Sequence, residues 1–285
     1  MKRILIIFCI ILGVYLLFFS SFNISSLLTG KDEQQARVTD NIDLIEIDVS
    51  SLDAVVIPEE RDNVKAVLDG KGKVTVKERG DKITVDYDRK WYQGFGFFNT
   101  PTLAVYIPEN YKEDMNIDIG SGTFNYDGGS AGNPAKLNHL SLHMGSGDVN
   151  IMNLDVKEYV QDVGSGSVVI ETLTAEKGVF NVSSGDTMLS NYSGQLNADV
   201  SSGELIVQMA KLNDAINIDV SSGDVSLDLP ADADFSLKGQ VSSGDIYSDF
   251  DLKNQNTSKK LMEGTYGSGK HEINLNVSSG QINVF

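Results

Sequence analysis

The sequence is poor in cysteine, proline and basic residues, and each shortage excludes something. A single cysteine, Cys9, allows neither an intramolecular disulfide nor a zinc site built from several cysteines. Five prolines among 285 residues do not make a proline-rich linker protein. Only 23 lysines and arginines stand against 40 acidic residues, so the net charge of −17 has the wrong sign for a fold that binds nucleic acid phosphates. We expect no nucleic acid partner.

Hydrophobic residues and glycine are well represented. Hydrophobic residues make up 41% of the chain, enough to bury a core, so the chain is not disordered as a whole. The 27 glycines, set against so few prolines, indicate many tight turns between regular strands.

The first 22 residues predict a transmembrane anchor. Residues 4–22 carry no charge, and 19 helical residues span about 28 Å, close to the hydrocarbon thickness of a bilayer. Lys2 and Arg3 precede this run, which favours a cytoplasmic N-terminus and an extracytoplasmic remainder in a single-pass protein of the cell membrane. A cleaved signal peptide is the alternative, although the run is long for one and no small-residue cleavage site follows.

The exported remainder is acidic and begins with a tether. Without Lys2 and Arg3 it has 21 basic and 40 acidic residues, a net charge of −19. Residues 23–41 are polar and aperiodic, and we interpret them as a polar tether.

A short turn motif recurs along the rest of the chain. The tripeptide Gly/Ser-Ser-Gly occurs nine times, with the serines 25, 19, 19, 18, 20, 21, 25 and 11 residues apart. Its last glycines, which we predict to be structural turn residues, are Gly122, Gly147, Gly166, Gly185, Gly203, Gly223, Gly244, Gly269 and Gly280. Because the last spacing is about half of the others, we expect Ser279 to occupy an opposite corner or to close a terminal hairpin.

The residues around the motif alternate in the manner of strands. Apolar residues occupy every second position before and after it, but the step across it is five, as from Val220 to Val225. A straight strand would turn Val225 to the other face, so the chain must turn a corner, and glycine supplies the positive φ that this needs. Corners every 18 to 21 residues predict an all-β fold, a β-solenoid of roughly 8–9 coils; a sandwich of similar hairpins is the alternative.

The solenoid pattern divides the exported part in two. Residues 108–285 form the predicted β-strand-repeat domain, and residues 42–107 an atypical N-terminal β region and cap. Within that region, Val49 and Ala54 show the same step of five, with Leu52 where glycine is expected. We interpret this as a degenerate first copy.

Three segments resemble a known family. They are residues 103–108 (Leu-Ala-Val-Tyr-Ile-Pro), residues 115–122 (Met-Asn-Ile-Asp-Ile-Gly-Ser-Gly) and the serial Val-Ser-Ser-Gly-Asp turns. Together they resemble the bacterial putative-adhesin family of β-strand-repeat domains over residues 42–285. Anchor and domain together are similar to a member encoded with a cell-envelope-stress response system in Gram-positive bacteria. The resemblance implies a membrane-anchored, extracytoplasmic envelope protein and no reaction.

The residues that could carry chemistry are mostly acidic. Asp148, Asp186, Glu204, Asp224 and Asp245 follow their turns directly, and stacked coils would bring such carboxylates near 5 Å from one another. One interpretation of these acidic residues is a calcium ladder or a sugar-binding acidic strip. The favoured interpretation is that aspartate occurs there because its side chain accepts hydrogen bonds from backbone N–H groups at turns. His139 and His143 lie four apart on a predicted strand, too far apart to chelate one ion. We expect no metal, no cofactor and no catalytic residue.

One aromatic segment stands apart from the repeat. Residues 91–98 hold five aromatic residues, our candidate binding residues, namely Trp91, Tyr92, Phe95, Phe97 and Phe98. The segment could stack on sugars, bind a partner or touch the membrane surface, or it could plug the open end of the solenoid.

The function expected from these features is non-catalytic. We expect a membrane-anchored scaffold, adhesin-like protein or accessory of the envelope-stress response, with the membrane as partner through residues 4–22. An envelope protein or a cell-wall polymer is the expected further partner, and pairing between copies stays open. The alternative is a β-helix enzyme that binds or degrades envelope polysaccharide, which would need a localised carboxylate cluster with a basic residue.

Overall fold

The computed structural model describes residues 32–88 and 101–285. Every regular element in these two stretches is a strand. Among these residues there is no helix that is long and apolar enough to cross a membrane. The predicted anchor, residues 1–22, lies outside the described residues, as do residues 23–31 of the predicted tether and the aromatic segment.

The strands fall into three groups along the chain. The first group is β1 (Asp32–Arg37), β2 (Leu44–Val49), β3 (Asp53–Glu59), β4 (Asn63–Asp69), β5 (Lys73–Arg79), β6 (Lys82–Asp88) and β7 (Thr102–Pro108). The second is β8 (Asp114–Ile119), β9 (Thr123–Asp127), β10 (Ala135–Met144), β11 (Asp148–Val163), β12 (Ser167–Val182), β13 (Asp186–Val200), β14 (Glu204–Lys211), β15 (Ile216–Val220) and β16 (Asp224–Asp228). The third is β17 (Phe235–Val241), β18 (Asp245–Ser248), β19 (Lys253–Ser258), β20 (Leu261–Tyr266), β21 (His271–Val277) and β22 (Gln281–Val284).

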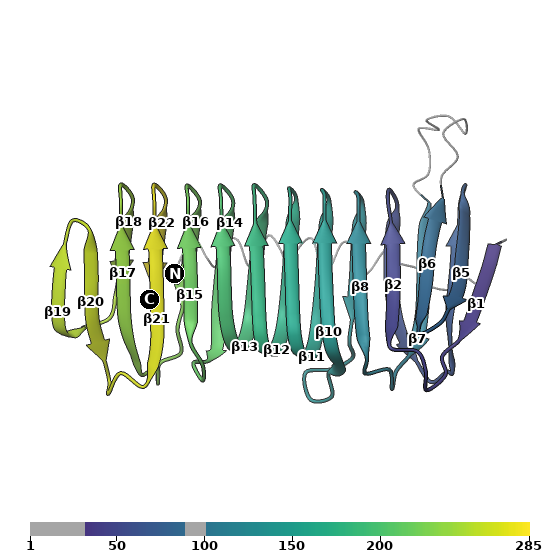
Figure 1. Ribbon diagram of the computed structural model, residues 1–285, viewed down its shortest axis with the longest axis horizontal. Coiled ribbons are helices and arrows are strands. Elements are labelled where there is room, and N and C mark those ends of the chain that lie inside the picture. The colour runs from purple at the N-terminus through teal and green to yellow at the C-terminus, as the bar shows by residue number, and fades with distance from the viewer. Residues whose placement is uncertain (1–31, 89–100) are drawn as a thin grey trace.

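These strands wind into a long β-solenoid (Figure 1). Successive coils pair in parallel and in register, so that Val163 of β11 lies beside Val182 of β12, and Val182 beside Val200 of β13. The corners stack in the same way, because the amide of each corner serine donates to a carbonyl of the neighbouring corner, as from Ser165 to Gly145 at 2.9 Å. Parallel stacking confirms the solenoid and is not the packing of a sandwich of hairpins.

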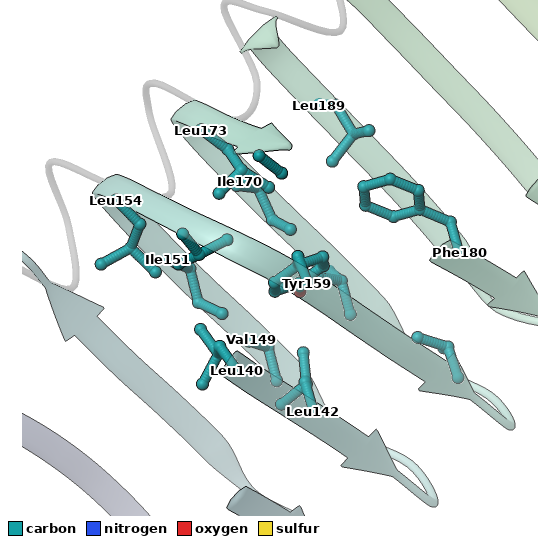
Figure 2. Close-up of a cluster of buried hydrophobic side chains, with 14 of the residues drawn as sticks. Leu140, Leu142, Val149, Ile151, Leu154, Tyr159, Ile170, Leu173, Phe180 and Leu189 are labelled. Atoms are coloured by element: carbon teal, nitrogen blue, oxygen red, sulfur yellow. The ribbon is translucent and has the colours of Figure 1, made fainter. Parts of the chain in front are cut away.

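The interior of the coils is an apolar core built from ladders of like residues. Ile151, Ile170 and Leu189 stack in one ladder, and all three are buried. Figure 2 shows such side chains pointing inward from successive strands. Inward residues flank each corner on both sides, as the step of five predicts, because the chain turns there without exchanging its faces.

A second line of corners was not expected from the sequence. Asn153, Thr172 and Asn191 have positive φ angles of 58°, 61° and 56°, and they lie 19 residues apart in successive coils. Parallel pairing skips these positions. The side chains are short and polar, and asparagine tolerates this backbone region better than most residues.

The corner glycines form one continuous stack, but positive φ is only part of the reason. Gly166 has a φ of 101°, whereas Gly203 has an ordinary backbone. A Cβ at Gly203 would overlap the carbonyl oxygen of Gly185 in the neighbouring coil, so close approach is what requires glycine there. We call the following nine residues, in spatial order, the glycine stack: Leu52, Gly122, Gly147, Gly166, Gly185, Gly203, Gly223, Gly280 and Gly244.

The order of this stack corrects the expectation for Ser279. The coil of β21 and β22 lies between the coil of β15 and β16 and the coil of β17 and β18. Ser279 is therefore at an ordinary corner, where its amide donates to Ser221 at 2.8 Å, and not at an opposite corner or in a terminal hairpin. The hairpin of β19 and β20, which lies outside the coils, accounts for the irregular spacing.

Gly269 also departs from the predicted pattern, because it lies outside the glycine stack. Residues 267–269 connect β20 to β21 at the start of a coil strand, not at its corner end. Three backbone amides of this turn, those of Ser268, Gly269 and Lys270, donate to the Asp234 carboxylate at 2.6 to 2.9 Å.

The N-terminal strands continue the same stack. The coil of β2 and β3 lies between β6 and β7 on one side and β8 and β9 on the other, with Leu52 at its corner. β1, which falls within the predicted tether, pairs antiparallel with β4, and β4 pairs antiparallel with β7. Antiparallel strands thus cover this end, while Phe235, Phe250 and Tyr266 pack edge to face or tilted in the core of the other end.

Candidate functional site

The acidic residues that follow the corners form a shorter row than expected. Asp186, Glu204 and Asp224 lie beside one another in three successive coils. Partial burial raises the pKa of Glu204, and the charges of Asp186 and Asp224 raise it further. Gln281 of the inserted coil separates Asp224 from Asp245, a break that chain order could not reveal.

A longer acidic row, missed from the sequence, precedes the corners. It runs along the outer face of the strands that end at a corner, two positions before each corner. We call it the aspartate row; its residues in spatial order are Asp86, Asp48, Asp118, His143, Asp162, Asn181, Asp199, Asp219, Asn276 and Gln240. Burial raises the pKa of Asp48, and the neighbouring Asp118 and Asp86 charges add to the effect. The sequence signal for this row was the Asp-Val pair that precedes four of the turns, at residues 48–49, 162–163, 199–200 and 219–220.

Asparagines beside the aspartate row lock the same face together. Asn217 donates to Asn197 at 3.0 Å, and Asn274 donates to Asn217 at the same distance. Asn276 donates to Asp219 at 2.7 Å across the next pair of coils. The face is therefore polar, regular and cross-linked by side chains.

One histidine on this face, His139, contacts an acidic residue of the neighbouring coil. His139 Nδ1 lies 3.4 Å from Glu158, which also accepts a hydrogen bond from Lys177 at 2.6 Å. These contacts, with Lys177 first, hold the pKa of Glu158 below its usual range. Within residues 32–88 and 101–285, no group of three or more histidine, cysteine or acidic side chains could hold a metal ion.

A cavity of about 930 Å³ lies where the N-terminal strands meet the regular coils. β3 pairs with β7 along its whole length, from Asp53 to Glu59, but with β9 only from Ala54 to Val56. After Tyr126 the chain no longer pairs with β3, and its next strand, β10, pairs with β8 and β11. We call the resulting cavity the junction pocket; its walls are β3, β9 and the loops at 109–112 and 128–136.

One wall of the junction pocket is apolar and the other side is polar. β3 contributes the aliphatic residues Val55, Ile57 and Pro58 to the lining. Val55 and Ile57 also pack against Val67, Ala104 and Tyr106, a second apolar cluster separate from the coil interior.

The pocket's two strand carboxylates are engaged in local structure. Asp53 accepts the amide of Thr123 at 3.0 Å, and Asp127 accepts the amide of Gly129 at 3.0 Å and the side chain of Asn153 at 3.1 Å. Both therefore fix the ends of β9.

The predicted aromatic site lies outside the described residues. Trp91, Tyr92, Phe95, Phe97 and Phe98 fall in residues 89–100, between the end of β6 and the start of β7. The proposed binding role and the proposed plug both remain predictions.

A family described as Toastrack DUF4097 matches residues 42–285. The chain belongs to this family. The Toastrack match spans the predicted N-terminal region and the repeat domain together, in agreement with the continuous pairing between them. No curated protein matches the chain.

Several solved structures are similar to the chain at low sequence identity. A putative adhesin from Parabacteroides distasonis is 13% identical, with 90% of this chain and 98% of that chain covered and a TM-score of 0.51. A putative adhesin from Bacteroides fragilis (13% identity, 89% and 96% covered) has a TM-score of 0.48. A putative lipid binding protein from P. distasonis (16% identity, 90% and 98% covered) has a TM-score of 0.44. The first of these likenesses supports the fold alone.

Proposed function

We propose that this Toastrack protein is a membrane-anchored, extracytoplasmic scaffold of the bacterial envelope that binds its partner without catalysis. The aspartate row is the observation that carries the proposal. It repeats one outward position over ten coil strands about 4.8 Å apart, and six of the ten residues at this position are aspartates, with histidine, asparagine or glutamine at the other four. Such a face fits a repetitive partner with cationic or hydrogen-bonding groups, either a cell-wall polymer or an envelope protein.

Catalysis is the weaker candidate. A polysaccharide-degrading site needs two carboxylates and a basic residue gathered in one cleft. The carboxylates of the aspartate row are spread along the solenoid, and two of the three in the junction pocket, Asp53 and Asp127, accept backbone amides. These arrangements favour binding over hydrolysis.

The envelope location is supported by the sequence. Residues 4–22 are apolar and follow two basic residues, and the acidic remainder suits the outside of the membrane. The anchor and solenoid together resemble LiaG, a protein encoded with a cell-envelope-stress response system in Gram-positive bacteria. We therefore propose an accessory role in that response.

Binding by the aspartate row can be tested with matched charge changes. The triple variant Asp162→Asn, Asp199→Asn, Asp219→Asn removes three charges from the row. The control Asp148→Asn, Asp186→Asn, Asp224→Asn removes three charges from the strands on the other side of the corners. We expect the first variant to lose most of its retention on isolated cell walls, with weaker salt dependence, and the control to keep it. Equal retention of both variants would contradict the proposal.

The anchor and the stress role need separate measurements. The full chain should stay in the membrane fraction after a high-salt wash, and deletion of residues 4–22 should release it. External protease should digest the solenoid in protoplasts. In a pull-down from envelope-stressed cells we expect an envelope protein to accompany the chain, and recovery of its own copies alone would argue against the accessory role.

A further inference from the structure

We propose that the junction pocket binds the aliphatic chain of a single-chain amphiphile with an uncharged or zwitterionic head. The proposal rests on the envelope location above for the source of the ligand, and on the pocket itself for its chemistry. The volume of about 930 Å³ lies within the range typical of sites for small molecules.

The pocket exists because the repeat is interrupted at one place. β3 extends to Glu59, whereas its neighbour β9 stops pairing with it at Tyr126 and ends at Asp127. Gly128 turns the chain away, and a Cβ there would overlap the carbonyl oxygen of Asn153 in the next coil. The strand edge beyond Val56 is thus left facing a cavity instead of another strand.

The apolar wall suits an alkyl chain better than a sugar or a peptide. Val55, Ile57 and Pro58 are aliphatic. Tyr111, the aromatic residue of the lining, is buried, and its hydroxyl donates to the Asp114 carbonyl at 2.7 Å, so its ring is no platform for sugar stacking. Pro58 lacks the amide that an added peptide strand would need from this edge.

The mouth of the pocket limits the charge of the ligand's head. Glu109, Asn110 and Lys112 lie on one loop of the lining, and within the described stretches their side chains make no hydrogen bond or ion pair. Lys136, at the start of β10, has its Nζ atom 3.7 Å from the Asp155 carboxylate. The lining has three acidic and two basic residues, Asp53, Asp127 and Glu109 against Lys112 and Lys136. With −17 on the whole chain, this balance disfavours an anionic head and offers partners of both signs to a zwitterionic or hydroxylated one.

The pocket lies at the end of the solenoid where the predicted anchor enters. Nine residues separate Phe22 from β1, which allows at most about 30 Å between the membrane and that strand. β1 pairs with β4, β4 with β7 and β7 with β3, so β3 lies three strand spacings, about 14 Å, from β1. A lipid leaving the outer leaflet would meet this site first.

Photolabelling of the full chain tests the assignment. The probe is a monoacylglycerol with a diazirine on its alkyl chain, added to the chain in non-ionic detergent, and the labelled residues are mapped by mass spectrometry. We expect labels at residues 55–58 and 133–136, and weaker labelling by a fatty acid that carries the same diazirine. Stronger labelling by the fatty acid would overturn the assignment of the head.

Two matched variants make the test specific. Val55→Glu places a charge on the pocket wall, and Val169→Glu places one at the same outward row position three coils further along. Both valines are half-buried. We expect labelling of the pocket to fall at least ten-fold in the first variant and to stay unchanged in the second, with similar melting temperatures. Equal labelling of the pocket in both variants, or labels confined to residues 4–22, would overturn the proposed pocket site. If the full chain is instead released from the membrane fraction by the high-salt wash but is still labelled in the pocket, the anchor alone is overturned.

Discussion

The middle of the solenoid and its two ends are built differently from the same repeat. From β10 to β13 each coil repeats the last, and apart from a bulge at Glu176 the inward, outward and corner positions have equivalents in the next coil. At the ends, strands from distant parts of the chain are inserted between consecutive coils, and antiparallel strands cover the core. This difference indicates where specific sites arise. The regular middle offers only a repeated surface, whereas the junction pocket lies where the repeat is interrupted.

The largest effect should come from filling the glycine stack in the regular middle. A side chain in Gly203→Val would overlap the carbonyl oxygen of Gly185 and crowd Val182, so the coil that carries these two residues would have to move. We expect a loss of about 3 kcal/mol in the free energy of unfolding, measured by urea denaturation.

The matched control lies in the irregular region. No atom lies within 4 Å of a Cβ at Gly132, in the loop beside the junction pocket. Gly132→Val should therefore change stability by less than about 0.5 kcal/mol. Similar losses in the two variants would show that the stack is not what requires glycine.

The next largest effect concerns the polar group buried among the middle coils. Gln161 accepts from Tyr159 at 3.0 Å and donates to Thr187 at 2.8 Å, and both Gln161 and Thr187 are at most 2% exposed. Gln161→Leu leaves two hydroxyls without this partner in the core, so we expect a loss of about 2 kcal/mol.

A double variant separates the network from simple packing. Adding Thr187→Val to Gln161→Leu removes one of the two stranded hydroxyls, and it should restore part of the stability in the same denaturation experiment. Strictly additive losses would contradict the role of the network.

The contrast between the middle and the ends also describes how far the sequence could predict this fold. The step of five, as from Val220 to Val225, predicted inward residues on both sides of each corner, because that step depends only on neighbours in the chain. The site of the last coil could not be found in this way. Ser279 stacks on Ser221, and only the excursion through β17 to β20 decides which coils it separates.

The aspartate row and the junction pocket also differ in how far the sequence could predict them. The aspartate row has a local sequence signal, a repeated Asp-Val before the turns, but the prediction rested on the acidic residues that follow the turns. The junction pocket has no local signal, because it depends on where β9 stops pairing with β3. Residues 1–31 and 89–100 hold the predicted anchor and the aromatic segment, which stay predictions.

The local stability of the turn between β20 and β21 should depend on pH. Asp234 accepts three backbone amides and the hydroxyl of Ser268, and these hydrogen bonds, that of Lys270 first, lower its pKa to about 2. A depressed pKa means that this carboxylate stabilises the fold above its usual pKa near 3.8, and that the contribution disappears as the pH falls from about 4 to 2. The hydrogen-exchange protection factors of residues 267–270, which are corrected for the intrinsic pH dependence of exchange, should therefore fall over that interval. In Asp234→Asn the protection factors should already be low at pH 7, and high protection in the variant would contradict this account.

The smallest effect has the opposite sign and lies in the regular middle. Burial and the flanking Asp186 and Asp224 raise the pKa of Glu204, so its ionised form costs stability once the pH rises above its usual pKa near 4.5. Glu204→Gln keeps the shape without the charge, and it should raise the melting temperature at pH 7 by an amount that corresponds to less than about 1 kcal/mol, because the site is partly solvated. The gain should vanish at pH 3, where wild-type Glu204 is protonated. A loss of stability at pH 7 would instead show that these three stacked carboxylates hold a cation, which the same melting experiment would reveal as a shift with added calcium.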